Sequence, residues 1–67
     1  MQGAMMTTAE VAARLRVPVP TLYKWRLESK GPRSIRIGKH LRYQERDVEA
    51  WIADQIVSSA RGGAGAA

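Results

Sequence analysis

The sequence predicts a small, mostly α-helical domain with one β-hairpin, and three observations support this. Two short helical segments are separated by only a few residues around a pair of prolines. An alternation of apolar and polar residues around a glycine follows, and a longer amphipathic segment comes last. Two helices joined by a tight turn are typical of a helix-turn-helix, and a hairpin beside them acts as a wing. The expected order is helix, helix, hairpin wing, helix: a winged helix-turn-helix.

The first predicted helix begins at a capping box. Thr7 and Glu10 are three residues apart, so each side chain can accept a hydrogen bond from the other residue's backbone N–H. An apolar stripe follows at helical spacing: Val11, Ala12 and Leu15. The helix should end near Arg16. Residues 1–6 (MQGAMM) show no periodicity, and we expect a disordered start or a cloning remnant there.

A second helix is predicted from about Pro20 to Ser29. Proline is tolerated at the first helical position because its missing N–H would have no partner there. At 100° per residue, Leu22 and Trp25 face the core while Tyr23 and Lys24 face outward. Leu27 falls near the exposed side, and we expect a later element to cover it. Lys30-Gly31-Pro32 stops the helix.

Residues 34–43 (SIRIGKHLRY) are predicted to form the hairpin. A three-residue loop, Gly38-Lys39-His40, would keep the apolar residues on one face, because directly opposed residues share a face. That register gives three pairs, the first two toward the core and the third outward: Ile37 with Leu41, Ile35 with Tyr43, and Arg36 with Arg42. Two arginines facing each other favour an anion nearby.

The third helix is predicted over residues 45–57 (ERDVEAWIADQIV) and is the most regular segment. Its apolar positions recur at i, i+3, i+4 and i+8: Val48, Trp51, Ile52 and Ile56. Acids fill its first turn, where the helix dipole favours them. Trp25 and Trp51 are interpreted as core residues because both fall on apolar stripes. Residues 58–67 have nothing to bury and are expected to form a flexible tail.

Composition excludes several function classes. The 67 residues include no Cys and one His, which argues against disulfides, a cysteine zinc site, a thiol nucleophile and a multi-histidine metal site. The serines have no nearby base, and no glycine-rich phosphate loop appears, so we expect no enzyme activity and no cofactor. No apolar run approaches the roughly 18 residues of a membrane span, so the protein is expected in the cytoplasm, without membrane contact.

The charge is concentrated in one part of the chain. The net charge is +5, yet residues 14–42 hold nine basic residues and one acid, whereas residues 43–57 hold one basic residue and four acids. Such a basic zone attracts polyanions, and with a helix-turn-helix it points to double-stranded DNA. The second helix would contact the major groove and the wing would contact the backbone or the minor groove. The candidate DNA-binding residues are Thr21, Tyr23, Lys24, Arg26, Arg36, Lys39, His40 and Arg42.

Four segments, TTAEVAARL, TLYKW, IRIGKHLRY and DVEAWI, together resemble the excisionase-type, MerR-related winged helix-turn-helix family of phage excisionases and small AlpA-like regulators. The resemblance covers about residues 6–57. It implies DNA contacts from Thr21, Tyr23 and Lys24 and from Lys39, His40 and Arg42. The chain differs from the family pattern at Pro18 and at Val19-Pro20, where Ser or a similar cap and a polar pair are usual.

The resemblance implies a small phage excisionase, or recombination directionality factor, acting in a bacterial host. Such a protein binds and bends attachment-site DNA and promotes integrase-mediated excision. Its expected partners are double-stranded DNA, a phage integrase and further copies of itself in a head-to-tail array. The charge split between residues 14–42 and 43–57 would support that array. The alternatives are an AlpA-like transcriptional regulator and a protein-interaction module that uses the last helix.

Overall fold

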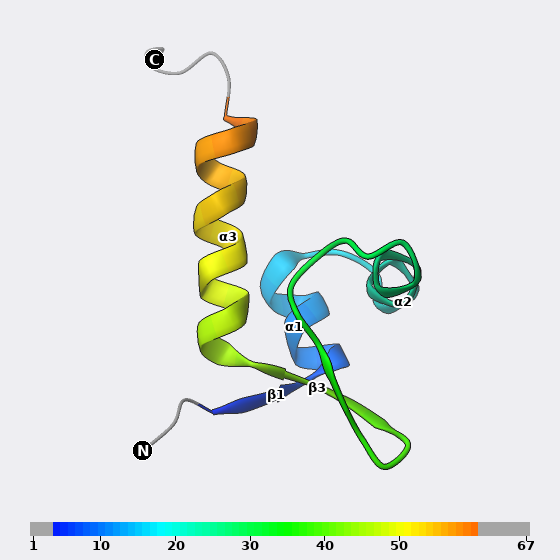
Figure 1. The fold of residues 1–67 in the computed structure, drawn as a ribbon. Helices are drawn as coiled ribbons and strands as arrows, with labels where there is room; N and C mark the ends of the chain where they lie inside the picture. The colour runs from blue at the N-terminus through cyan, green and yellow to red at the C-terminus, as the bar shows by residue number, and fades with distance from the viewer. Residues whose placement is uncertain (1–3, 61–67) are drawn as a thin grey trace.

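A computed structural model describes residues 4–60 of the chain. Three helices and a three-stranded antiparallel sheet form the domain (Figure 1). In chain order the elements are β1 (Met5–Thr7), α1 (Thr8–Leu15), α2 (Val19–Leu27), β2 (Ile35–Ile37), β3 (His40–Gln44) and α3 (Glu45–Ser59). α1 and α2 form the helix-turn-helix, and the β2–β3 hairpin lies on the same side of the domain as α2, with its turn pointing away from the helices (Figure 1).

The capping box at the start of α1 is confirmed. The Thr7 N–H donates to Glu10 Oε1 at 2.8 Å, and the Glu10 N–H donates to Thr7 Oγ1 at 3.1 Å. Arg16 closes the helix in the left-handed conformation, with φ 59°. The next N–H, that of Val17, donates to the Ala12 carbonyl at 3.0 Å, which turns the chain sharply toward α2.

α2 begins one residue before the predicted start and ends two residues before the predicted end. Pro20 occupies its first turn, as the sequence indicates, and the Thr21 N–H donates to the Pro18 carbonyl at 3.0 Å. After Leu27 the chain leaves the helix, and Ser29 adopts a positive φ of 58°.

The prediction for the start of the chain was wrong for Met5 and Met6, which belong to strand β1. This strand pairs with β3, so that Met6 lies opposite Tyr43 and packs against the core. The Glu45 N–H also donates to the Ala4 carbonyl at 2.9 Å. Residues 1–3 lie outside the described residues. No pattern in the sequence indicates β1, because a three-residue strand is too short to show a periodicity.

The predicted hairpin register was also wrong. The loop has two residues, Gly38 and Lys39, and the pairs are Ile35 with Arg42, Arg36 with Leu41, and Ile37 with His40. Gly38 has φ 62° and Lys39 does not have a positive φ, a combination that suits a type II′ turn and needs no third loop residue. This short turn outweighs the gain from grouping the apolar residues, because the hairpin extends beyond the core and Ile37 stays 53% exposed.

α3 runs two residues beyond its predicted end, so residues 58 and 59 are helical and do not belong to a flexible tail. The rest of the predicted tail, residues 61–67, lies outside the described residues. α3 is joined to α1 by an ion pair between Glu49 and Arg14. Asp47 in its first turn lies 3.8 Å from Arg33. The second half of α3 projects away from the body of the domain (Figure 1).

The core lies where α1, α2, β3 and α3 meet. It consists of five buried hydrophobic residues: Val11, Ala12, Leu22, Tyr43 and Val48. Trp25 packs against this cluster, as predicted, and also against Trp51, with ring centroids 5.6 Å apart. Trp51 is half-buried and contacts the Trp25 ring, but it does not belong to the core cluster. The predicted cover over Leu27 does not form, and this side chain is 87% exposed. The fold is a winged helix-turn-helix. Within residues 4–60, no helix is long and apolar enough to cross a membrane.

Candidate nucleic-acid interface

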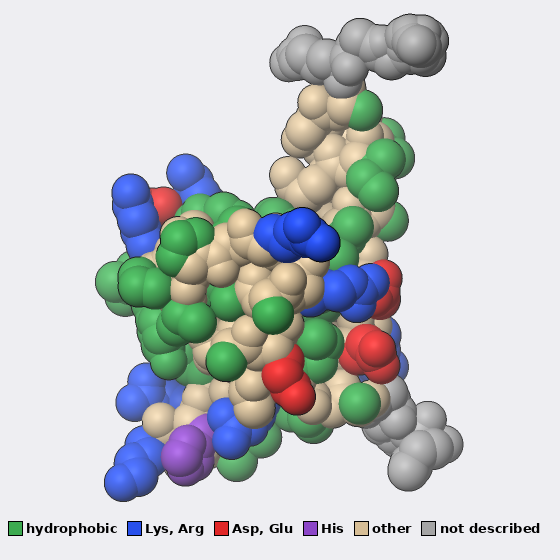
Figure 2. Space-filling view, turned by 180° about the vertical axis from the view of Figure 1, so that it is seen from behind, with side chains coloured by type: hydrophobic (Ala, Val, Ile, Leu, Met, Phe, Trp, Pro, Cys, Tyr) green, Lys and Arg blue, Asp and Glu red, His purple; other side chains and the backbone are tan. Residues whose placement is uncertain are grey.

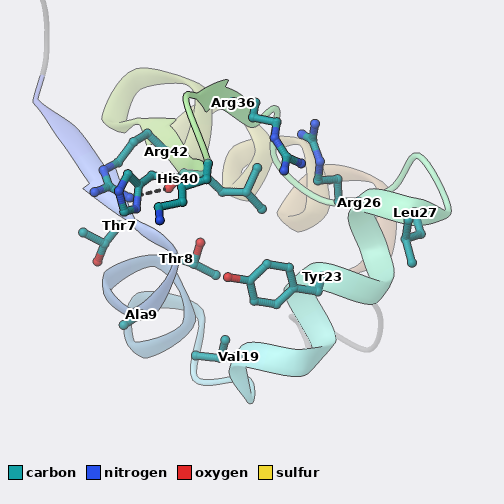
Figure 3. Close-up of a pocket in the computed structure, with 12 residues that line it drawn as sticks. Thr7, Thr8, Ala9, Val19, Tyr23, Arg26, Leu27, Arg36, His40 and Arg42 are labelled. Carbon is teal, nitrogen blue, oxygen red and sulfur yellow. Dashed lines mark hydrogen bonds between the residues drawn. The ribbon is translucent and has the colours of Figure 1, made fainter.

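An open cavity with a volume of about 520 Å³, called the concavity below, lies between α2, the β2–β3 hairpin and the start of α1 (Figure 3). Six of the eight candidate DNA-binding residues line it: Tyr23, Arg26, Arg36, Lys39, His40 and Arg42. These residues come from positions 23 to 42 of the chain and meet because the hairpin folds back beside α2. The fold therefore joins the helix and the wing into one surface.

Two arginines from different elements share one side of this concavity. Arg26 comes from α2 and Arg36 from β2, and Figure 3 shows their side chains extending toward one another. The Arg26 guanidinium donates to the Ser34 hydroxyl, which holds it toward the hairpin. Within the described part of the chain, neither guanidinium forms an ion pair. Two like charges held together without a carboxylate favour an anion between them.

Three further basic residues line the hairpin side. Lys39 sits in the turn, and His40 and Arg42 follow on β3. The Arg42 guanidinium donates to the neighbouring Leu41 carbonyl at 2.7 Å, so one of its nitrogens is held against the strand (Figure 3). In the observed register Arg36 and Arg42 belong to opposite faces of the hairpin, although both reach the concavity.

Tyr23 points into the concavity from α2 and is 48% exposed (Figure 3). Its hydroxyl can donate or accept a hydrogen bond. Tyr43, in contrast, is a core residue at 2% exposure, and burial raises its pKa above the usual value of 10.0, an effect that the Arg26 charge partly opposes. Tyr43 therefore belongs to the core beneath the concavity, whereas Tyr23 lines the concavity itself.

The other two candidate residues do not line the concavity. Lys24 is exposed on the outer side of α2, next to Tyr23 in the chain. Thr21 is half-buried. It shares a face of α2 with Trp25, four residues later, and not with Tyr23. The structure thus separates Lys24 and Thr21 from the other six, because successive residues of a helix point about 100° apart.

The structure adds six lining residues that the sequence did not identify as part of the site: Thr7, Thr8, Ala9, Val19, Leu27 and Leu41. Thr7 is the N-cap of α1, and Thr8 and Ala9 begin its first turn, where the helix dipole contributes partial positive charge. The capping box located this helix start in the sequence. Its position beside the wing depends on β1, which the sequence did not indicate.

The charge around the concavity is of one sign. Of the residues that line it in the described part of the chain, none is Asp or Glu. Three of the acids pair elsewhere: Glu49 with Arg14, Asp47 with Arg33, and Glu28 with Lys30 at 3.6 Å. Residues 4–60 contain no group of three or more His, Asp or Glu side chains that could hold a metal ion. The arrangement suits an extended anion.

Comparison with protein families gave one match. Residues 5–56 fit the family described as a helix-turn-helix domain, which covers both helices of the motif, the sheet and most of α3. The comparisons with curated proteins and with solved structures gave no match. The family match spans most of the chain and agrees with the three-helix, three-strand fold. The chain therefore belongs to the helix-turn-helix domain family.

Proposed function

We propose that this protein binds double-stranded DNA sequence-specifically through the concavity between α2 and the wing, and that it does so without enzymatic activity. The observation that carries the proposal is the meeting of Arg26, Arg36, Lys39 and Arg42 on one surface without a lining carboxylate among the described residues. Membership of the helix-turn-helix family supports DNA as the anion.

The geometry suggests how a duplex would lie. α2 is exposed along one side and fits the width of a major groove. Arg26 and Arg36 would then grip the phosphate backbone at the groove's edge. Lys39 and His40 at the wing tip would follow the backbone toward the minor groove. Lys24, outside the concavity, would contact base edges from the outer side of α2, and Thr21 would offer its hydroxyl to a phosphate.

Within this function we propose the role of an excisionase that bends attachment-site DNA and acts with a phage integrase. The support is the resemblance of residues 6–57 to excisionase-type modules. A small AlpA-like regulator would use the same surface. Recombination with purified integrase separates these roles: an excisionase raises the yield of excision, whereas a regulator changes transcription from a promoter and leaves excision unaffected.

A protein-interaction module using α3 is the second candidate, favoured by Ile56 and Val57, which are 64% and 83% exposed on that helix. DNA binding and protein interaction through α3 predict opposite results when duplex DNA is titrated into the protein. A module of this kind would show no heat and no salt dependence when duplex DNA is added, since the α3 face carries no basic cluster.

The test of DNA binding is a titration of the full chain with duplex DNA at several salt concentrations. If roughly five or six phosphates are neutralised, log K should fall linearly with log salt at a slope of about −5. The Arg36→Ala variant should reduce the slope by about 1, because one phosphate contact is lost. A slope near zero would contradict the proposal.

A further inference from the structure

The exposed side of α2 carries a row of apolar side chains as well as cations. Pro20, Tyr23 and Leu27 are spaced i, i+3 and i+7, so they lie along one side of the helix. Leu27 is 87% exposed and Tyr23 is 48% exposed, and both line the concavity. An isolated exposed leucine is ordinary, but this one continues a row of exposed apolar side chains on the helix that faces the proposed DNA site.

Cations flank this apolar row. Lys24 is exposed on its outer side, and Arg26 and Arg36 lie on its inner side. Figure 2 shows hydrophobic side chains gathered over α2, with Lys and Arg side chains on either side of them. Glu28, the residue that directly follows α2, lies 3.6 Å from Lys30. A partner for this row must therefore combine an anionic rim with apolar groups at its centre.

The major groove of DNA has this combination. Its edges are phosphates, and the thymine C5-methyl is the apolar group that it presents. We infer that Pro20, Tyr23 and Leu27 read thymine methyl groups, so that the protein selects major-groove sites with thymines at set positions. This inference rests on the proposed function and adds the base to be recognised. A protein partner with an acidic rim would present the same kind of surface, and the test below separates the two.

The test removes the methyl groups from the DNA. The full chain first selects its best duplex from a pool of random sequences. Each thymine of that duplex is then replaced in turn by deoxyuridine, which differs only by the missing methyl. Binding should weaken about threefold to fourfold at each contacted position. Replacements outside the α2 footprint should have no effect.

Variants of the protein assign the contact. In Leu27→Ala the preference for thymine over deoxyuridine should fall to about 1 at one of those positions and persist at the others. Val57→Ala is the matched control, since Val57 is 83% exposed on α3 and away from the concavity. It should keep every thymine preference. Leu27 buries little, so circular dichroism should show both variants folded.

The outcomes of these binding experiments separate the inference about thymine from the proposed DNA binding. Tight binding with equal affinity for thymine and deoxyuridine at every position would overturn this inference and leave the proposed DNA binding intact. A thymine preference that Leu27→Ala leaves unchanged would also overturn it. Failure to enrich any duplex would contradict the inference and the proposed function together, and would favour an acidic protein as the partner.

Discussion

At the scale of single residues, one glycine ties the end of α2 to the tryptophan pair. Gly31 has φ 76°, and a Cβ built there would lie 2.9 Å from Cε3 of Trp25. The Trp25 ring cannot move aside freely because it packs against Trp51, with ring centroids 5.6 Å apart and the ring planes tilted by 42°. Gly38 in the wing turn has a similar φ of 62° but nothing within 4 Å of its Cβ position. Both glycines thus have a left-handed backbone conformation, but only Gly31 also lacks the space for a Cβ.

We predict that Gly31→Ala lowers the free energy of unfolding by about 2 to 4 kcal/mol, the sum of a left-handed alanine and a steric overlap with Trp25. Gly38→Ala should cost only about 1 to 2 kcal/mol, because it has the backbone term alone. Urea unfolding followed by tryptophan fluorescence measures both. Equal costs would show that the Trp25 contact is not limiting.

The two exposed lysines of the proposed interface should make different contacts with DNA, one with a base and the other with a phosphate. Lys24 lies on α2 and Lys39 in the wing turn. We expect Lys24→Ala to weaken binding to the selected duplex more than to random DNA, since a base contact is lost. Lys39→Ala should weaken both about equally, because a phosphate carries no sequence information. Fluorescence anisotropy with the two duplexes measures the ratio, and an equal ratio for both variants would assign both lysines to the backbone.

At the scale of elements, α1 depends on its cap. It has eight residues, and isolated helices this short are marginal, so the capping box and packing must hold it. β1 precedes it directly, which fixes the direction in which the helix leaves the sheet. Loss of the cap would therefore loosen the part of the concavity that Thr7 to Ala9 line.

Thr7→Ala should lower the free energy of unfolding by about 1 kcal/mol, since the Glu10 N–H loses its acceptor. Thr7→Ser keeps the hydroxyl and should stay within about 0.5 kcal/mol of the parent protein. Thermal denaturation followed by circular dichroism measures both variants. A serine variant as unstable as the alanine variant would assign the loss to the methyl group of Thr7 instead.

At the scale of the whole molecule, the chain divides into a cationic surface at α2 and the wing and an acidic helix α3. The acids of α3 are not equivalent. Glu49 pairs with Arg14 of α1, whereas Asp54 forms no ion pair within residues 4–60. If copies associate head to tail on DNA, the acids of α3 available to a neighbour's cations are Asp54 and, at the start of the helix, Glu45, which also forms no ion pair within residues 4–60. Glu49 instead joins α3 to α1.

Asp54→Asn should accordingly reduce the cooperativity of binding to duplexes with several sites and leave single-site affinity unchanged. Glu49→Gln is the comparison: it should lower stability by less than about 1 kcal/mol, as for other exposed ion pairs, and affect cooperativity less. Mobility-shift titrations on one-site and three-site duplexes measure both. Unchanged cooperativity in Asp54→Asn would count against this electrostatic array.

Local sequence was sufficient where short-range forces decide the structure. The capping box, the proline-started α2 and the amphipathic α3 were predictable because hydrogen bonds and apolar spacing within a few residues determine helices. The basic zone of residues 14–42 was also predictable, because charges can be counted directly along the chain. The tertiary structure alone decided the pairing of β1 with β3, the two-residue turn of the wing and the exposure of Leu27. Each depends on how far the sheet and α2 extend beyond the core, which no local pattern encodes. The meeting of Arg26 with Arg36 follows from that packing, whereas the separation of Lys24 from Arg26 follows from the 100° spacing of residues within α2.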